Sequence, residues 1–410
     1  MKNDNYKNKK LCKIRTITSF ISLTKDKNSW ESRIKKASIF GSELAKEFNK
    51  NGYEVQSIRI VTNAFGEYLD TSSLENCLKD MKILSEILQQ TSPQDVRIRF
   101  AIGEVKTTQE IELAPYLIKE FGDLSNICVN IKADDLGIPD YDLTLKSAKA
   151  VKEIAKITPR GEGNFNFTIN YNCKPLIPYF PASYHNSSEE DSFALGLESP
   201  DLLKEVLQNL PFQKQHNRFI KLAYNSMREA LDYHIRNIVN ITENFNHKNK
   251  TKFAGIDTSA APSKNCTSIV DIYKLLGVPF FGACSTLEIS SVLTKVFKNQ
   301  TSCNTIGFSG LMLALIEDLG LAEASKKSQF DIKDLLQYSS VCGIGLDTVP
   351  IEGDTPVEKI ASIAMDTGIL AYRLNKPLTV RLFPVPGLKA GEITEFESED
   401  LCNSAVLALP

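Results

Sequence analysis

The stretch SSVCGIGLDTVPIEGD, Ser339 to Asp354, has the pattern of a buried strand that runs into a turn. The apolar and β-branched positions of Ser340–Val349 are bounded by glycine and aspartate, which is typical of a strand in the interior of a protein. Thr355 and Glu358 follow with a proline between them, a combination that marks the start of a helix. A strand followed directly by a helix is the repeating unit of α/β proteins, so this stretch predicts that class.

The same alternation of strand-like runs and amphipathic helices recurs along the chain. Five runs precede a helical middle segment and five follow it. Because parallel neighbours need a crossover helix between them, the alternation predicts a mostly parallel sheet. The predicted strands are Lys13–Leu23, Val55–Asn63, Val96–Val105, Ile127–Asp134, Asn164–Asn172, Phe253–Ser259, Pro279–Ser285, Thr305–Gly310, Ser340–Val349 and Leu378–Val385.

These divisions predict one α/β domain over residues 13–410, preceded by a disordered polar tail over residues 1–12. In the helical middle, an apolar stripe from Phe219 to Ile238 is interpreted as core packing. His234 lies on this stripe and is interpreted as a buried histidine with satisfied hydrogen bonds. The parts of the domain are a first half (13–198), a helical segment (199–246) and a second half (253–410).

Composition and charge exclude several classes of protein. Among the 410 residues, 48 are basic and 50 acidic, and a net charge of −2 gives no basic field to attract nucleic acid or an anionic membrane. The sequence contains neither a signal peptide nor an apolar run of the roughly 18–20 residues that a membrane helix needs. The nine cysteines are scattered without a CxxC pair, which favours free thiols in a reducing, cytoplasmic compartment. The four histidines share no ligand spacing, so no metal site is predicted.

The predicted strands of the second half lead directly into small and polar residues. Ligands of parallel α/β proteins bind beyond the carboxyl ends of the strands, where backbone N–H groups converge. We therefore expect these polar side chains to line one site, although glycine, serine and aspartate are also what any strand-to-helix turn requires. The candidates are Asp257, Ser259, Ser285, Ser309, Cys342 and Asp347.

Two chemistries are open to these residues. Cys342 could act as a nucleophile if its thiol pKa were lowered, or it could simply be a small buried residue at a strand end. Carboxylates could transfer protons or hold Mg²⁺ with a phosphate, and the candidates are Asp257, Glu317, Asp318, Asp347 and Asp354. Glu317 and Asp318 lie on or just past a predicted helix, where they are interpreted as helix-surface charges. Arg15 and Arg381 lie within predicted strands, where a buried arginine needs a carboxylate partner or the anionic group of a substrate.

Several segments together resemble an uncharacterised family, domain of unknown function 711, also called uncharacterised protein family 0210. In the family an aspartate–cysteine pair follows the isoleucine–serine–leucine of the first motif, whereas Thr24 and Lys25 follow here. The segment FFGACSTLE, which contains Cys284, also departs from the family pattern, whereas Cys342 and Asp347 match it. The matching segments are IRTITSFISL, PYFPASYH, GIDTSAAPS, GFSGLMLALIED, VCGIGLDTVPIEGDT and RLFPVPGLKAGE.

The resemblance implies a fold and a partner. The family is similar to pyruvate formate-lyase and anaerobic ribonucleotide reductase, which implies a ten-stranded α/β barrel of two five-stranded parallel halves. It also implies a homodimer and weakly suggests amino-acid-related metabolism. The glycyl radical of those relatives is not expected, because the tail Arg381–Gly387 reads RLFPVPG and lacks their Arg-Val-x-Gly loop.

Three functions remain open at this point. The first is a non-radical enzyme that acts on a small anionic metabolite, with Cys342, Asp347 and Asp257 as catalytic residues. In this hypothesis Arg15 and Arg381 bind the substrate's anionic group, and the serines Ser259, Ser285 and Ser309 complete the pocket. The second is a metabolite-binding or regulatory protein without turnover. The third is a Mg²⁺-dependent enzyme that handles phosphoryl groups.

Overall fold

A computed structural model describes residues 4–91, 98–211 and 214–410 of the chain. Nine strands within these ranges form one mixed sheet, in the order β7-β6-β1-β2-β3-β4-β5-β9-β8. The strands are β1 (Lys13–Ile21), β2 (Ile58–Thr62), β3 (Ile98–Glu104), β4 (Asn126–Ile131), β5 (Phe167–Tyr171), β6 (Ser192–Glu198), β7 (Lys252–Asp257), β8 (Gly345–Glu352) and β9 (Leu378–Val385).

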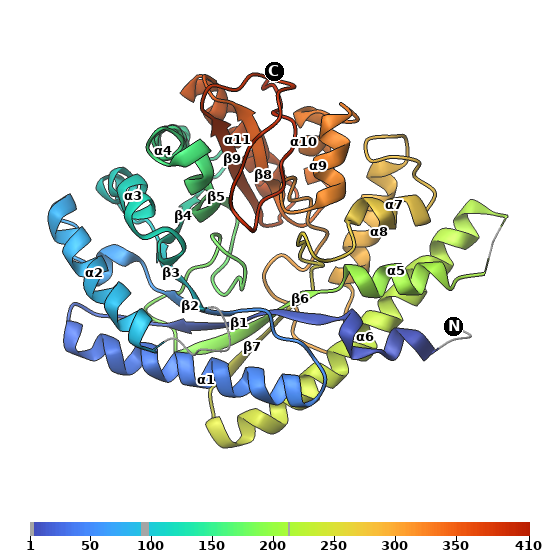
Figure 1. Ribbon diagram of the computed structural model, residues 1–410, viewed down its shortest axis with the longest axis horizontal. Helices are drawn as coiled ribbons and strands as arrows, with labels where there is room; N and C mark the ends of the chain where they lie inside the picture. Colours follow the sequence, from blue (N-terminus) through green and yellow to red (C-terminus); the bar gives the residue numbers. More distant parts are fainter. Residues whose placement is uncertain (1–3, 92–97, 212–213) are drawn as a thin grey trace.

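Helices cover the convex side of this curved sheet, and irregular segments occupy its concave side (Figure 1). Helix α1 buries Trp30, Ile34, Leu44 and Phe48, which follow the expected three- and four-residue spacing. The α-helices are α1 (Trp30–Lys50), α2 (Leu74–Thr91), α3 (Thr108–Phe121), α4 (Tyr141–Ile157), α5 (Pro200–Gln208), α6 (His216–Asn249), α7 (Ile269–Leu275), α8 (Thr286–Lys298), α9 (Leu319–Lys326), α10 (Ile332–Ser339) and α11 (Val357–Arg373).

Most neighbouring strands are parallel, as the alternation with helices predicts. Strands β1 to β5 pair in parallel in sequence order, and the pairs β6–β7 and β8–β9 are also parallel. The pairs β1–β6 and β5–β9 are antiparallel. The register places Arg59 of β2 directly beside Arg99 of β3, which becomes important at the functional site.

The prediction of ten strands is wrong for the described residues, which contain nine. Pro279–Ser285 forms a turn between α7 and α8, where Gly282 (φ +101°) and Ser285 (φ +74°) adopt conformations that a strand does not allow. Thr305–Gly310 also forms no strand. Strand β6 was not predicted, although all seven of its residues are buried.

The segment around residues 305–314 contacts both edge strands of the sheet. Ile256 of β7 forms an isolated parallel bridge with Thr305, and Asp347 of β8 forms another with Ala314. The segment therefore lies between β7 and β8, at the place in the chain where the eighth strand was expected.

The start of the chain differs from the expected disordered tail. Residues 4–11 form two short 3-10 helices, Asp4–Lys7 and Lys9–Leu11. His234 of α6 donates from Nε2 to the carbonyl of Tyr6 (2.7 Å) and accepts at Nδ1 from the hydroxyl of Tyr53 (3.0 Å). The interpretation of His234 as a buried histidine with satisfied hydrogen bonds is confirmed, and its partner is the segment that was expected to be disordered.

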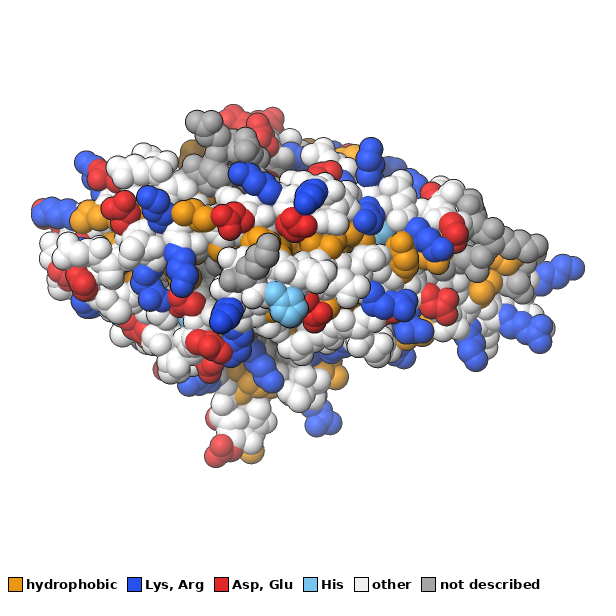
Figure 2. Space-filling view, turned by 90° about the horizontal axis from the view of Figure 1, so that it is seen from below, with side chains coloured by type: hydrophobic (Ala, Val, Ile, Leu, Met, Phe, Trp, Pro, Cys, Tyr) orange, Lys and Arg blue, Asp and Glu red, His pale blue; other side chains and the backbone are white. Residues whose placement is uncertain are grey.

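The surface shows no large region of one charge on the face seen in Figure 2. Lysine and arginine side chains alternate there with aspartate and glutamate side chains. Among the helices of the described residues, none has the length and apolar character needed to cross a membrane.

Candidate functional site

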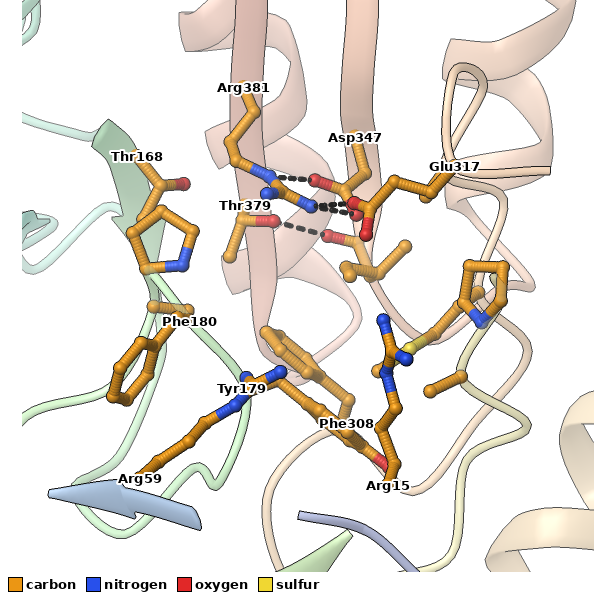
Figure 3. A pocket seen from close by; sticks show the side chains of 17 residues that line it. Arg15, Arg59, Thr168, Tyr179, Phe180, Phe308, Glu317, Asp347, Thr379 and Arg381 are labelled. Atoms are coloured by element: carbon orange, nitrogen blue, oxygen red, sulfur yellow. Dashed lines mark hydrogen bonds and ion pairs between the residues drawn. The ribbon is translucent and has the colours of Figure 1, made fainter. Parts of the chain in front are cut away.

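A small cavity lies on the concave side of the sheet, with β1 and β2 on one side and β8 and β9 on the other (Figure 3). The volume open to the centre of a water-sized sphere is about 40 Å³, and one water needs roughly 10–15 Å³ by this measure. The cavity therefore has room for about three waters or for the head group of a small ligand. We call it the arginine pocket, and its principal residues are Arg15, Arg59, Tyr179, Phe180, Phe308, Glu317, Asp347 and Arg381.

One wall of the pocket is a buried cluster of one arginine and two carboxylates. Arg381 of β9 donates from Nε to Oδ1 of Asp347 (2.5 Å) and from Nη2 to Oδ2 of the same carboxylate (2.9 Å). Its Nη2 also donates to Oε1 of Glu317 (2.6 Å). Burial opposes the charge of Arg381, but the two carboxylates outweigh that effect and raise its pKa. This guanidinium therefore stays cationic and fixes both carboxylates in place.

The carboxyl group of Glu317 has a raised pKa. Burial raises its pKa, Arg381 opposes the rise, and the neighbouring charge of Asp347 adds to it. One guanidinium thus serves two carboxylates, and the carboxylate with a single hydrogen bond to it is Glu317. The side chain of Glu317 keeps 14% of its surface exposed, so a ligand in the pocket can reach it. A carboxyl group with a raised pKa that a ligand can reach is suited to proton transfer.

Arg59 of β2 forms the opposite wall, and no carboxylate of the described residues pairs with it. Its side chain is 6% exposed, and its Nε has no hydrogen-bond partner among the described residues. The guanidinium lies 4.9 Å from the centre of the Phe180 ring, which covers one of its faces. Burial, together with the positive charges of Arg99 and Arg15, lowers the pKa of Arg59 to about 9. A buried cation without an anionic partner is costly, so this arrangement favours an anion from outside the chain.

Arg15 of β1 points into the same space as Arg59 (Figure 3). Its Nη1 donates to Oε1 of Gln56 (3.1 Å) and lies 3.7 Å from Oε2 of Glu198. Glu198 also accepts a hydrogen bond from Lys13 (3.1 Å), so its negative charge is shared between Lys13 and Arg15. Arg15 is therefore partly neutralised by the protein, in contrast to Arg59.

A loop inside the concave side of the sheet supplies the aromatic wall of the pocket. The hydroxyl of Tyr179 donates to the carbonyl of Leu197 (3.0 Å), and Asn170 of β5 donates to the carbonyl of Ala182 (3.0 Å). Thr18 of β1 donates to the carbonyl of Pro178 (2.9 Å). Strands β1, β5 and β6 thus hold the loop, and the loop holds Phe180 against Arg59.

Three of the predicted site residues lie together in the pocket. Arg15, Asp347 and Arg381 all line it, although Asp347 and Arg381 pair with each other. Cys402 donates its backbone N–H to the carbonyl of Ile316 (2.7 Å), which ties the C-terminal segment to the turn that carries Glu317.

Asp257, Ser259 and Ser309 form a separate buried network that joins the end of β7 to the following segment. Oδ1 of Asp257 accepts from the Ser259 hydroxyl (2.7 Å) and from the backbone N–H of Ser309 (3.0 Å). Its Oδ2 accepts from the backbone N–H of Phe308 (2.7 Å). Burial raises the pKa of Asp257 to about 6, although these hydrogen bonds oppose the rise. None of the three lines the pocket, and their bonds fix the loop that carries Phe308.

Cys342 and Ser285 also lie outside the arginine pocket. Cys342 is fully buried in the turn between α10 and β8, and its carbonyl accepts from the side-chain amine of Lys376. Burial lowers the pKa of Lys376, which also donates to the carbonyl of Ser339 (3.0 Å). Ser285 is exposed at the start of α8 and makes no side-chain capping bond there. The surroundings of Cys342 agree with its alternative interpretation as a small buried residue.

Arg59 was not predicted as a site residue, and Glu317 was named only among the possible acid–base carboxylates. Arg59 lies in the predicted strand Val55–Asn63 between two isoleucines, the same pattern that singled out Arg15 and Arg381. Glu317 was interpreted as a helix-surface charge, but it lies in the turn before α9, where Asp318 is the N-cap. Within the described ranges, no group of three or more histidine, cysteine, aspartate or glutamate side chains is placed to hold a metal ion.

Comparison with known proteins identifies relatives along almost the whole chain. The profile of the family described as "Uncharacterised ACR (DUF711)" matches residues 6–398. A UPF0210 protein of Carboxydothermus hydrogenoformans is 25% identical over 407 residues, covering 93% of this chain and 88% of the relative. A UPF0210 protein of Methanocaldococcus jannaschii is 25% identical over 343 residues, covering 78% of this chain and 72% of the relative. The resemblance inferred from the sequence motifs is confirmed.

Proposed function

The chain belongs to the uncharacterised DUF711 family, and we propose that it is a non-radical enzyme that acts on a small anionic metabolite bound in the arginine pocket. The observation that carries this proposal is Arg59, a buried cation that has no carboxylate partner in the described part of the chain and that lies across a small cavity from the Glu317 carboxyl group. Acid–base catalysis on an anionic substrate requires a group that binds the anion and a group that accepts or donates a proton, and the two walls of the pocket can supply one each.

Each side chain has a distinct role in this proposal. Arg59 binds the anionic group of the substrate, and Phe180 keeps the guanidinium in position. Glu317 takes a proton from the substrate when it is ionised and returns a proton when it is protonated. Asp347 is a positioning residue, because it holds Arg381, which in turn orients Glu317.

The proposal changes which residues are expected to act. Asp347 and Arg381 remain, but as the support for Glu317 rather than as the proton donor and the anion-binding group. Cys342 and Asp257 have no part in the proposed reaction, since neither lines the pocket. The buried amine of Lys376 is assigned to the end of α10, where it binds the carbonyl of the last helical residue, Ser339, and that of Cys342 in the following turn.

The test combines native mass spectrometry of the purified protein with Arg59→Met and Glu317→Gln variants. We expect a small acidic molecule to accompany the wild type and to be absent from Arg59→Met. Glu317→Gln should retain the molecule but fail to convert it when it is added in excess and followed by NMR. Retention of the same molecule by Arg59→Met would overturn the proposed site.

A second candidate is a binding or regulatory protein without turnover, and the close ion pair between Glu317 and Arg381 favours it. In such a protein the carboxylate of Glu317 would orient the guanidinium of Arg381 and would transfer no proton. In that case Glu317→Gln and the wild type would bind the molecule with similar affinity, and neither would change it over hours.

We also propose that the fold is a closed barrel, with residues 305–314 between the two edge strands. The two isolated bridges from Ile256 and Asp347 support this closure. A crystal structure in which this segment leaves either edge strand would contradict it. The resemblance to pyruvate formate-lyase stays a prediction, as does the single domain over residues 13–410.

Two further proposals concern the state of the protein in the cell. The nine cysteines are all free thiols, which supports a cytoplasmic location. Retention of activity only under oxidising conditions would count against it.

A homodimer is supported by exposed apolar side chains before and at the start of α4, namely Leu136, Ile138 and Tyr141. Sedimentation as a monomer at micromolar concentration would contradict the dimer.

A further inference from the structure

The geometry points to a small monocarboxylic acid as the ligand of the arginine pocket, with its carboxylate bound edge-on to the guanidinium of Arg59. This inference rests on the proposed function and deepens it, because it names the chemical class of the ligand. It is supported by the pairing of the neighbouring arginines, by the charge of the pocket and by the orientation of Arg59.

The other arginines of the sheet show which groups pair with an arginine side chain on these strands. Four arginines lie within the described strands, one each on β1, β2, β3 and β9. Three of them contact carboxylates of the chain itself, whereas Arg59 contacts none within residues 4–91, 98–211 and 214–410. The pairs are Arg15 with Glu198, Arg99 with Asp123 and Asp400, and Arg381 with Asp347 and Glu317.

Arg99 is the closest comparison, because it is the direct neighbour of Arg59 in the sheet. It is similarly buried, at 8% exposure against 6% for Arg59. Both also lie over an aromatic ring, Phe165 for Arg99 (5.8 Å) and Phe180 for Arg59 (4.9 Å). The principal difference is the carboxylate, which Asp400 supplies to Arg99. A ligand carboxylate would pair with Arg59 and neutralise its charge, as Asp400 does for Arg99.

The charge of the pocket favours a single negative charge. Its walls carry Arg15, Arg59 and Arg381 against the carboxylates of Glu317 and Asp347. Because Glu198 neutralises part of the charge of Arg15, the net charge of the set is at most +1 when both carboxylates are ionised, and a single monoanion is enough to balance it. A phosphate dianion would bring a second negative charge towards Glu317 and Asp347, which like-charge repulsion opposes.

The orientation of Arg59 favours a planar acceptor. The guanidinium is planar, so its N–H donors point outward in one plane, and the ring of Phe180 packs against it. The Nε donor has no partner among the described residues. A carboxylate can accept from two N–H donors of one guanidinium in that plane, as Asp347 does from Arg381. The cavity of about 40 Å³ also limits the ligand to a short acid.

The test measures the thermal midpoint of the purified protein against rising concentrations of acetate, propionate, inorganic phosphate and methylphosphonate at constant ionic strength. We expect saturable stabilisation by the two carboxylates and at least tenfold weaker apparent affinity in Arg59→Met. Arg59→Lys should lie between the two, because it keeps the charge and loses the fork of donors. Arg33→Gln removes a half-exposed arginine that pairs with Asp191 on the outer face, and it should behave as wild type.

The outcomes separate the two proposals. Stabilisation by phosphate or methylphosphonate that depends on Arg59, with none by the carboxylates, would overturn the carboxylate class and leave the anion site standing. Equal effects of all anions in wild type and Arg59→Met would overturn both, because the anions would then act elsewhere. Circular dichroism establishes that each variant is folded before its affinities are compared.

Discussion

Replacing Arg59 with methionine should stabilise the protein in the absence of ligand. The pKa of Arg59 is lowered to about 9, and against the ordinary arginine value this corresponds to a penalty on the order of 4–5 kcal/mol at 1.36 kcal/mol per pKa unit. The variant loses the contact with Phe180, worth about 1–2 kcal/mol, and some packing volume. A net gain on the order of 1–3 kcal/mol in the free energy of unfolding remains.

The pH dependence of this effect has a definite sign. The folded pKa of Arg59 lies below its unfolded value, so between the two values the unfolded chain binds the additional proton. The penalty is fully present below pH 9 and declines as the pH rises above it. The advantage of Arg59→Met over wild type should therefore be constant from pH 7 to 8 and shrink above about pH 9.

The assay is equilibrium urea unfolding in a buffer without carboxylate or phosphate ions. Arg99→Met is the matched control, because Arg99 is equally buried but contacts Asp400. It should destabilise the protein by about 1–2 kcal/mol, since an ion pair of a mostly buried group is lost. If Arg59→Met destabilises the protein as much as Arg99→Met does, then the protein itself compensates the charge of Arg59 and the reasoning is wrong.

Three further predictions concern residues outside the pocket. Cys284 is exposed and Cys342 is buried. A thiol reagent at neutral pH should therefore label Cys284 in the folded protein and Cys342 only upon unfolding. Rapid labelling of Cys342 in the folded protein would restore it as a candidate nucleophile. Asp257→Asn should destabilise the protein by about 2–4 kcal/mol, because an amide nitrogen would face the backbone N–H groups that Asp257 accepts from; an unchanged urea midpoint would contradict this. Burial lowers the pKa of His234 to about 4, below its unfolded value of about 6.5. The free energy of unfolding should therefore fall by about 3 kcal/mol as the pH drops from 6.5 towards 4. A His234→Gln variant should lose this part of the acid sensitivity, and an unaltered acid profile would refute the assignment.

Much of the fold follows from local patterns in the sequence. The β-branched runs and amphipathic helices placed most strands within a few residues, because burial on both faces produces a continuous apolar signal. Pro279–Ser285 has a similar composition but forms a turn, since Gly282 and Ser285 adopt positive φ values that composition alone does not reveal. Strand β6 was missed because SFALGLE contains few β-branched residues and its burial comes from β1 and β7 on either side.

The site was predicted less completely than the fold, for physical reasons that differ between residues. Arginine in an apolar strand is a strong signal, and it correctly placed Arg15 and Arg381 in the pocket. The same signal was present for Arg59 and would have found it. Glu317 could not be located from the sequence, since its position depends on a segment that passes between β7 and β8. The polar residues that follow β7 serve the local turn, as Asp257 shows.

The central claim is that Arg59 binds the carboxylate of a small ligand, and ¹⁹F NMR of trifluoroacetate tests it most directly. This monocarboxylate is small and needs no knowledge of the natural ligand. We predict saturable broadening of its resonance by the wild type and by Arg99→Met, reversal by excess acetate, and loss of the broadening in Arg59→Met. Equal broadening by wild type and Arg59→Met would contradict the claim.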